Sequence, residues 1–554
     1  MSLAYLFLIF FFAFWICCEV KAIRFWLYLW QLKDYLWGRF ADHFQTNQGM
    51  RALFSVPFFF KFALFAIAGI AYAYARGAFS LAGSLGAWSI LILVCVWYAL
   101  ETVKNLRDFM RGSPKVPVWT IKARVLDGVS FFVIFVAGLF FIHAFSSLLL
   151  AVMALLALDL GTPILVSAVV LSLEPVAVFE RKRLVRLATR KRQQFKNLAV
   201  VGITGSYGKT SVKEFLAHIL SQKFNMLKTA EHRNSEVGIA KTILEELKQE
   251  HEVFVCEMGA YKKGGIKLLA GMAHPSIGIV TGINEQHMAT FGSLQNIIDT
   301  KFELIEALPM QGIGIVNWDN QHIQKSKIKY QNDKSKLKII RASTKEQTDI
   351  WAEDIKVEKE WVEFTARTRE GESAGFRVNV LGKHNIQNIL LAAGAAKELG
   401  MTLREIARAC AAITPAIGAM KLKKGIGGST IIDSSYSANP DGVVSDLEYL
   451  ALWEGRKIIV MPCLIELGKA SKEAHEKIGR KIAEVCDRAV ITTKERFEDV
   501  KKGAVAGGMR QEHILFMEHA VHIMEQIGKT AEPGDAILVE GRVQKEIINS
   551  LVGA

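Results

Sequence analysis

The stretch "VVGITGSYGKTSVKEFLAHIL", residues 200–220, predicts the fold of the second part of the chain. Its apolar run indicates a buried β-strand, a glycine-bearing turn follows, and the remainder has the spacing of a helix. Strand, tight turn and helix in this order are typical of α/β proteins that bind an anion at the start of the helix, where free N–H groups point outward. We therefore predict a parallel-sheet domain with a nucleotide-binding loop.

The loop carries the residue types that phosphate binding requires. Glycines allow a close backbone approach, the lysine neutralises phosphate oxygens, and a hydroxyl after it can bind Mg²⁺. The strict phosphate-loop pattern is not met, because Ile203 stands where that pattern has glycine. The residues expected to contact ATP are Gly205, Ser206, Gly208, Lys209, Thr210 and Ser211.

Three further stretches carry polar side chains that this loop could use. They are a strand with Glu257 at its end ("EVFVCEMGA", 252–260), a strand that leads to His287 ("PSIGIVTGINEQHMATFGS", 275–293) and a helix with Lys301 ("IIDTKFELIEAL", 297–308). Ligands of open α/β sheets bind at the carboxyl ends of the strands. We therefore expect Glu257 and His287 at the same edge of the sheet as the loop.

The first part of the chain is mostly apolar and predicts membrane spans. "SLAYLFLIFFFAFWICCEV" (2–20) is long enough to cross a bilayer, for which about 20 apolar residues suffice. A cleaved signal peptide is the weaker alternative, because no basic region precedes the run and no small-x-small site follows it. Further spans are expected at about 53–75, 84–101, 127–145 and 146–178.

Basic residues indicate the orientation of these spans. They are frequent in 21–51, 102–126 and 180–196, whereas 76–83 carries only Arg76. Because short loops rich in Lys and Arg stay in the cytosol, five spans with the N-terminus outside fit this distribution. A hairpin within 146–178 would give six spans and place the second part of the chain outside, away from ATP. We therefore expect five spans, catalytic domains in the cytoplasm, and membrane lipid as a partner.

Charge and cysteine content exclude two other classes of protein. The net charge is +14 and the mean hydropathy is +0.23. Part of the positive charge lies in 180–196, where it suits anionic headgroups, and no basic cluster with interleaved aromatics indicates nucleic acid as a partner. The seven cysteines show no Cys-x-x-Cys pair, which favours reduced thiols over a disulfide framework or a zinc site.

Most of residues 198–545 resembles the Mur ligase family, the ATP-dependent amide-bond ligases of bacterial cell-wall synthesis. Besides the loop, the resemblance is carried by "RNSEVGIAKTIL" (233–244), "LGKHNIQNILLAAGAAKELG" (381–400), "IIDSSYSANPDGV" (431–443) and "IELG" (465–468). Within the family, these stretches are most similar to the members that add D-alanyl-D-alanine. The fold that the resemblance implies is an α-helical membrane segment followed by α/β domains, a P-loop-type parallel-sheet central domain and a Rossmann-like C-terminal domain.

The expected organisation has four parts: a transmembrane segment at 1–179 with about five helices, a basic juxtamembrane linker at 180–197, a central ATP-binding domain at 198–415 and a C-terminal domain at 416–554. The location that follows is the bacterial inner (plasma) membrane.

The resemblance also implies roles for single residues. Lys209, His287 and Lys301 would be catalytic, and Lys301 aligns with the lysine that family members carbamylate. Two Mg²⁺ ions would be held by Thr210, Glu257, His287 and the modified Lys301. The adenine pocket and the closing C-terminal domain would add His384, Asn385, Asn388, Asp433, Tyr436 and Asn439.

The sequence departs from the family pattern at several points. Ser235 and Ser434 replace an asparagine and an aspartate, and an arginine that would contact the γ-phosphate is missing, with Lys421 or Lys423 as substitutes. The membrane segment stands in place of the soluble domain that holds the UDP-muramoyl group.

The expected function is a membrane-anchored ATP-dependent amide ligase that activates a substrate carboxylate as an acyl phosphate for attack by an amine. The substrate would be a peptidoglycan-precursor-like carboxylate and the amine donor a dipeptide, D-Ala-D-Ala, or an amino acid. A ligase for another polymer, such as a poly-γ-glutamate-type synthetase, and a non-catalytic ATP-binding membrane sensor are the alternatives.

Overall fold

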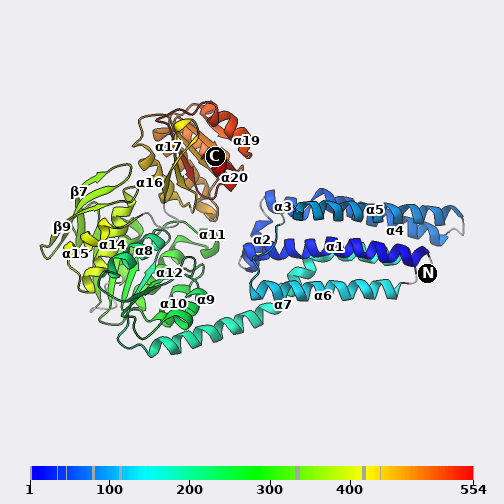
Figure 1. Ribbon diagram of the computed structural model, residues 1–554, viewed down its shortest axis with the longest axis horizontal. Helices are drawn as coiled ribbons and strands as arrows, with labels where there is room; N and C mark the ends of the chain where they lie inside the picture. The colour runs from blue at the N-terminus through cyan, green and yellow to red at the C-terminus, as the bar shows by residue number, and fades with distance from the viewer. Residues whose placement is uncertain are drawn as a thin grey trace. The chain divides into compact units, whose positions relative to one another are not determined.

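The computed structural model divides the chain into two compact units, Met1–Glu180 and Arg181–Ala554 (Figure 1). It describes residues 3–33, 35–44, 47–77, 81–110, 115–145, 147–330, 337–414, 420–436 and 438–552. The expected domain boundary at 415/416 lies outside these residues. Each unit is described on its own.

The first unit consists of helices. Among the described residues, five helices are long and apolar enough to cross a membrane: α1 (Leu3–Leu32), α4 (Val56–Gly77), α5 (Leu81–Met110), α6 (Ile121–Ala144) and α7 (Leu148–Gln193), the last of which continues past Glu180 into the second unit. Two short helices, α2 (Trp37–His43) and α3 (Asn47–Leu53), connect α1 to α4. The prediction of five long apolar helices is confirmed, and 146–178 is not a hairpin, because Pro163 and Pro175 lie inside α7.

Several of these helices are longer than predicted. α1 continues from Val20 to Leu32 through residues that the sequence assigned to a loop. Its buried face continues through Ile23, Leu27 and Trp30, so packing outweighs the basic residues between them. Lys21, which lies just before Ile23, donates a hydrogen bond to Asn105 of α5 at 2.5 Å. The basic loops are therefore shorter than the sequence indicated, because helices extend into them.

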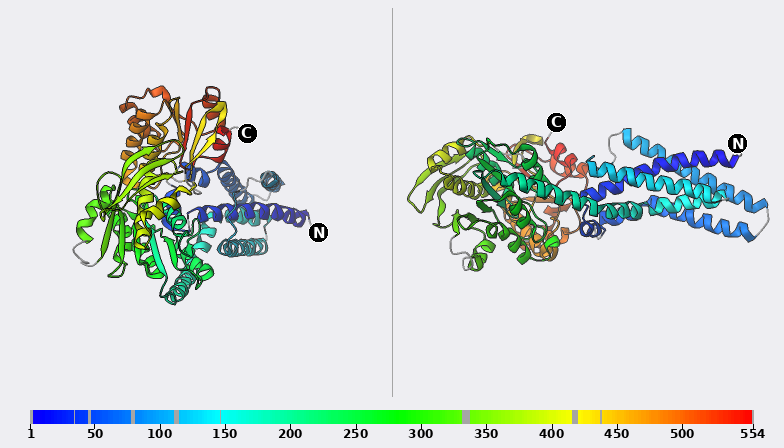
Figure 2. Two further views of the ribbon diagram at one scale, coloured as in Figure 1. Left: turned by 60° about the vertical axis from the view of Figure 1, so that its left-hand side comes forward. Right: turned by 90° about the horizontal axis from the view of Figure 1, so that it is seen from below.

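The second unit contains two sheets, which Figure 2 shows from two further sides. The first has nine strands in the order β2-β3-β1-β4-β5-β6-β7-β8-β9. Its strands are β1 (Ala199–Thr204), β2 (Met226–Lys228), β3 (Val253–Glu257), β4 (Ile277–Val280), β5 (Ile313–Asn317), β6 (Lys338–Ser343), β7 (Ile350–Val357), β8 (Val362–Thr368) and β9 (Ser373–Val378). The pairs from β2 to β7 are parallel, and β7, β8 and β9 pair antiparallel.

Helices cover both faces of this sheet. On one face, α8 (Lys209–Leu220), α14 (His384–Glu398) and α15 (Leu403–Ala411) bury apolar side chains against the strands. On the other lie α10 (Gly265–Ala273) and α12 (Leu294–Glu306), together with the short α9 (Glu236–Lys241). Strands buried on both faces read as continuous apolar runs, which is why the sequence predicted them.

The second sheet has six strands in the order β10-β11-β15-β12-β13-β14, all parallel except β10. Its strands are β10 (Lys421–Lys424), β11 (Thr430–Ser434), β12 (Lys457–Met461), β13 (Arg488–Ile491), β14 (Ile514–Phe516) and β15 (Ala536–Glu540). One face packs on α16 (Pro440–Leu450) and α17 (Ser471–Val485), the other on α19 (Ala520–Ile523) and α20 (Lys545–Leu551). The predicted parallel α/β architecture is confirmed for both sheets.

Candidate active site

The loop between β1 and α8 has a backbone that only glycine adopts easily. Gly205 has φ 155° and Gly208 has φ 76°. A Cβ atom at Gly205 would lie 2.1 Å from the Thr281 hydroxyl, and one at Gly208 would lie 2.8 Å from Oδ1 of Asn388. Thr281 donates a hydrogen bond to the carbonyl of Tyr207, which holds the loop against β4. The loop is therefore fixed from both sides by residues far away in the sequence.

Lys209 lies folded back over this loop. Its amine donates hydrogen bonds to the carbonyls of Gly205 (2.8 Å) and Ser206 (3.2 Å). Burial lowers the pKa of Lys209, and the negative charge of Glu257 opposes the shift. A cation held at the mouth of a loop of N–H groups is suited to bind phosphate.

Glu257 lies beside the loop, as expected, because β3 pairs with β1 and Glu257 stands opposite Ile203. The Thr210 hydroxyl donates to its Oε2 at 3.2 Å, and the Asn234 amide donates to its Oε1 at 2.9 Å. The amine of Lys213, which is fully buried, lies 3.4 Å from Oε2. A carboxylate and a hydroxyl in contact are hard oxygen donors of the kind that Mg²⁺ prefers.

Asn234 and Lys213 received no role in the sequence analysis. Asn234 belongs to the stretch 233–244, which carries part of the family resemblance. The sequence gives no sign that its amide contacts Glu257. Lys213 lies one helical turn after Lys209, a spacing that puts both on one side of α8.

His287 is held by the C-terminal half of the second unit. Its Nδ1 is hydrogen-bonded to a carboxylate oxygen of Glu466, and its backbone has φ 66°. Burial lowers the pKa of His287, while the hydrogen bond with Glu466 acts in the opposite direction. With Nδ1 engaged, Nε2 is the nitrogen left to bind a metal, an arrangement common for metal-binding histidines. Glu466 lies in the quoted "IELG", but the sequence assigned it no role.

Lys301 is buried on α12, with 3% of its surface exposed. Burial lowers its pKa to about 7, the positive charge of Lys209 adds to the shift, and Glu303 opposes it. No ion pair of Lys301 is found among the described residues. A large fraction of this amine is therefore uncharged near neutral pH, which is the form that can react with CO₂.

These side chains do not form a preassembled metal cluster. In the described ranges, no three His, Cys, Asp or Glu side chains are grouped so that they could hold a metal ion. A Mg²⁺ ion at Thr210 and Glu257 would need further oxygen ligands, and phosphate or water oxygens are the usual ones.

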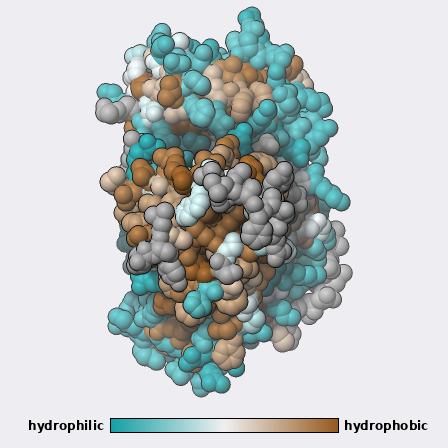
Figure 3. All heavy atoms as spheres, turned by 90° about the vertical axis from the view of Figure 1, so that its right-hand side faces the viewer, coloured by the Kyte–Doolittle hydropathy of each residue, from teal (hydrophilic) through white to brown (hydrophobic). Residues whose placement is uncertain are grey.

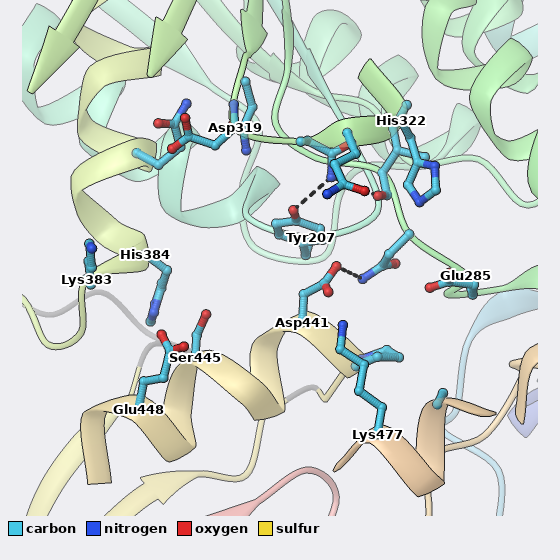
Figure 4. Close-up of a pocket in the computed structure, with 18 of the residues that line it drawn as sticks. Tyr207, Glu285, Asp319, His322, Lys383, His384, Asp441, Ser445, Glu448 and Lys477 are labelled. Carbon is cyan, nitrogen blue, oxygen red and sulfur yellow. Dashed lines mark hydrogen bonds between the residues drawn. The ribbon is translucent and has the colours of Figure 1, made fainter. Parts of the chain in front are cut away.

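A cavity of about 760 Å³ lies between the two sheets of this unit (Figure 4). Tyr207 and Asp319 line it from the first sheet, and Asp441 and Lys477 line it from α16 and α17. Of the three residues expected in an adenine pocket, His384 lines the cavity. The other two, Asn385 and Asn388, are buried in α14, where they bond each other, and Asn388 packs against Gly208.

Polar contacts join the two sheets' domains at the edge of this cavity. The Asn284 amide donates to Asn439 at 2.7 Å and to Asp441 at 3.1 Å. Tyr436 is hydrogen-bonded to His232 at 3.1 Å and stacks on it. These contacts place Asn439 and Tyr436 next to the first domain.

Asp433 faces a different partner. Its carboxylate accepts a hydrogen bond at 2.6 Å from Lys423, one of the two lysines considered as a substitute for the missing arginine. The structure therefore brings Lys423 to the expected region but pairs it with Asp433.

Comparison with known proteins gives matches to both domains. Residues 203–396 match the Mur ligase middle domain, and residues 420–543 match the "Mur ligase, glutamate ligase domain". The UDP-N-acetylmuramoyl-tripeptide–D-alanyl-D-alanine ligase of Escherichia coli is 33% identical over 294 residues, which are 53% of this chain and 64% of that enzyme. The ligase of the same name from Mycobacterium bovis is 30% identical over 382 residues, 64% of this chain and 73% of that enzyme.

A solved structure shows the same likeness in three dimensions. The crystal structure of MurF from Acinetobacter baumannii superposes with a TM-score of 0.59 and 27% identity, covering 65% of this chain and 77% of that one. The chain thus spans less than two thirds of the E. coli enzyme's length, and its family matches lie in the second unit.

Proposed function

The chain belongs to the Mur ligase family, and we propose that it is an ATP-dependent ligase that joins a substrate carboxylate to an amine. The observation that carries this proposal is the contact of Thr210 with Glu257 beside Lys209, at the end of a loop whose Tyr207 lines a cavity large enough for a nucleotide.

The proposed reaction has two steps. The carboxylate oxygen of the substrate attacks the γ-phosphorus of ATP, the bond to the β-phosphate oxygen breaks, and an acyl phosphate and ADP form. The amine then attacks the acyl carbon, phosphate leaves, and the amine's proton is released. Lys209 would offset the negative charge on the transferring phosphoryl group, and the backbone N–H groups of the loop would orient it.

Two features of the site support exclusion of water, which would hydrolyse the acyl phosphate. The hydrogen bonds of Asn284 with Asn439 and Asp441 join the domains on one side, and the bond of His287 with Glu466 joins them on another. We propose that Asp433, Tyr436 and Asn439 contribute to ATP binding in this joined arrangement.

We propose Mg²⁺ as the cofactor, held by Thr210 and Glu257 at one position and by Nε2 of His287 and a carbamylated Lys301 at another. Bound Mg²⁺ neutralises phosphate charge. The hydroxyl–carboxylate contact and the low pKa of the Lys301 amine fit this assignment. His384, Asn385 and Asn388 would form the adenine side of the cavity and its support.

For the substrates, we propose a peptidoglycan precursor peptide and D-Ala-D-Ala, because the relatives named above are ligases of a UDP-N-acetylmuramoyl-tripeptide and D-alanyl-D-alanine. The second candidate is an amide ligase for another polymer. It is favoured by one observation: five long apolar helices begin before residue 203, where the match to the Mur ligase middle domain starts.

We also propose that the first unit lies in the bacterial plasma membrane, with five spans in 1–179 and the catalytic domains in the cytoplasm. Its outer surface carries large exposed apolar side chains, including Phe10, Phe62, Ile70, Phe132 and Phe140. Figure 3 shows hydrophobic side chains gathered on the face of this unit that it displays. An apolar surface of this extent marks contact with lipid or with another protein.

The segment 180–197 would serve as a basic linker, with the central domain at 198–415 and a Rossmann-like domain at 416–554. Part of the positive charge of the linker has a structural role. Arg192 is buried and donates to the carbonyls of Phe195 (2.7 Å), Ala273 (2.9 Å) and Leu198 (3.1 Å). Lys191 also donates to the carbonyl of Leu244 at 2.9 Å. The positive charge of the segment as a whole would suit anionic headgroups.

Phosphate release from the purified full chain tests this function. We expect release to require a UDP-muramoyl tripeptide together with D-Ala-D-Ala, and to fall at least about 100-fold in Lys209→Ala, because a preorganised charge on the phosphates is lost. Lys248→Ala, at an exposed lysine, is the matched control. Release with glutamate instead would favour the second candidate, and full activity of Lys209→Ala would refute the nucleotide site.

A further inference from the structure

The helical first unit contains a group of charged side chains in its interior. They come from four different helices, and we call them the buried charge cluster: Glu19 of α1, Lys61 of α4, Glu101 of α5 and Asp159 of α7. Sequence analysis identified none of them as interacting, because they stand up to 140 positions apart. Ionisable side chains inside a membrane bundle are costly and usually have a function.

Lys61 is the only cation of the cluster, and two carboxylates share it. Its amine lies 2.7 Å from Asp159 and 3.0 Å from Glu101. Asp159 also accepts a hydrogen bond from the Tyr98 hydroxyl, and the Lys61 amine lies 4.9 Å from the centre of the Tyr98 ring. The Glu101 side chain keeps 22% of its surface exposed, and its Oε2, although buried, lies next to the Lys61 amine.

Glu19 has no comparable compensation. Only 1% of its surface is exposed, and within the described residues its Oε1 has no hydrogen-bond partner. Its Oε2 lies 2.7 Å from the hydroxyl of Thr162, one helical turn from Asp159. The same hydroxyl lies 3.1 Å from the carbonyl of Leu158, and its single hydrogen can serve only one of the two oxygens. The charged groups that face Glu19 are Asp159, Lys61 and Glu101.

The charges of the cluster do not balance. Three carboxylates and one ammonium would leave two negative charges in the interior of the bundle. An unpaired carboxylate removed from water costs several kcal/mol, whereas a protonated carboxyl group avoids this cost and gains an O–H donor. The Lys61 amine pairs with Asp159 and Glu101, and the Tyr98 hydroxyl donates a hydrogen bond to Asp159. Glu19 is therefore the carboxylate of the cluster that has no ion pair.

We propose that Glu19 is a proton-binding site in the interior of the helical unit, with the proton on the carboxyl group that faces Asp159. The bundle is then more than an anchor, because a purely apolar core would hold the helices together without buried charges. The inference rests on the proposed position of this unit in a membrane and not on the ligase reaction.

Infrared spectroscopy of the full chain in dodecyl maltoside micelles, a detergent without ester carbonyl groups, tests the proposal. At about pH 7, a typical glutamate is ionised, whereas a buried one can keep its proton up to about pH 8–9. We expect the C=O stretching band of a protonated carboxyl group in the wild type. It should be absent in Glu19→Gln and present in the matched control Glu174→Gln, since Glu174 lies on α7 with its side chain 28% exposed and paired with Lys122.

Stability gives a second readout. Glutamine has the shape and neutrality of protonated glutamate, so Glu19→Gln should change the thermal midpoint by less than about 3 °C. An undiminished band in Glu19→Gln would place the proton on another carboxyl group, and a much larger loss of stability would indicate an ionised Glu19. Either result would overturn the proposal. Loss of the band when sodium chloride replaces choline chloride would assign the site to sodium and overturn it as well.

Failure of the ligase proposal would leave these results intact, because they need no ATP. In the same preparations, phosphate release should be equal in Glu19→Gln and Glu174→Gln.

Discussion

At the scale of single residues, the candidate site depends on side chains that hold other side chains. Glu257 accepts a hydrogen bond from the Asn234 amide and forms an ion pair with the Lys213 amine. His287 is oriented by its hydrogen bond with Glu466. Such supporting contacts fix a metal-binding carboxylate or imidazole in one orientation before the metal arrives. Their loss should therefore change cofactor affinity more than folding.

Asn234→Ala tests this for Glu257. The substitution removes the 2.9 Å hydrogen bond to Oε1 and leaves Thr210 as the direct contact. We expect the Mg²⁺ concentration for half-maximal phosphate release to rise about 10- to 100-fold, the usual effect of removing a supporting contact. Asn225→Ala, at a residue whose backbone rather than side chain bonds Glu252, is the control. An unchanged Mg²⁺ requirement would mean that Glu257 does not bind the metal.

Lys301 gives a prediction about pH. Its pKa of about 7 lies far below the 10.5 of a free lysine, so the neutral amine that reacts with CO₂ is formed as pH rises through about 7. Activity should therefore fall below pH 7 and be restored in part by added bicarbonate. Lys301→Ala should lose activity at all pH values and show no response to bicarbonate. A wild-type activity that is indifferent to CO₂ would contradict the carbamylation.

At the scale of elements, α17 is attached to the loop after β12 through a neutral histidine. Nε2 of His475 accepts the N–H of Leu464 at 2.9 Å, and Nδ1 lies 2.6 Å from the Ser471 carbonyl. Nδ1 therefore carries the hydrogen, and a proton on Nε2 would break the bond to Leu464. Burial lowers the pKa of His475, and the bond to Ser471 opposes the shift.

The lowered pKa predicts the direction of an effect on stability. Below the unfolded-state value of about 6.5, the unfolded chain binds a proton at this position that the folded chain does not bind. The contribution of His475 is thus fully present above about pH 6.5 and is lost as pH falls. In thermal unfolding of the full chain, the midpoint of the wild type should drop more between about pH 7 and 5 than that of His475→Gln. Parallel curves would show that His475 is not responsible.

At the scale of the whole molecule, the chain combines a Mur ligase pair of domains with a unit of five long apolar helices. An odd number of spans puts the two ends of the membrane segment on opposite sides. With the proposed five spans, the basic segment after residue 180 would lie on the cytoplasmic side, where ATP is available. This arrangement would keep the ligase reaction beside the membrane.

Cell fractionation and tag accessibility test this arrangement. The full chain should stay in the membrane pellet after an alkaline carbonate wash, as expected for spanning helices rather than for a surface-bound basic segment. A tag at the N-terminus should be accessible from outside intact cells, and one at the C-terminus only after permeabilisation. Release by the wash, or both tags on one side, would refute the five-span topology.

The sequence by itself determined the type and approximate position of the elements that local patterns encode. The loop at 200–220, the buried strands around it and the five apolar helices follow from short-range periodicity and glycine placement, which act within a few residues. The structure confirms these elements. It corrects their lengths, since α1 and α5 continue past the charged residues that seemed to end them.

Only the tertiary structure decided which side chains meet. His287 and Glu466 are 179 positions apart, and Glu19 and Thr162 are 143 apart. No local pattern encodes such pairs, since they arise when packing of helices and sheets brings distant segments into contact. The sequence could name His287 through the resemblance, but it could not show that Glu466 orients it. For the same reason, it gave no sign that Glu19 lacks a cation while Asp159 shares Lys61 with Glu101.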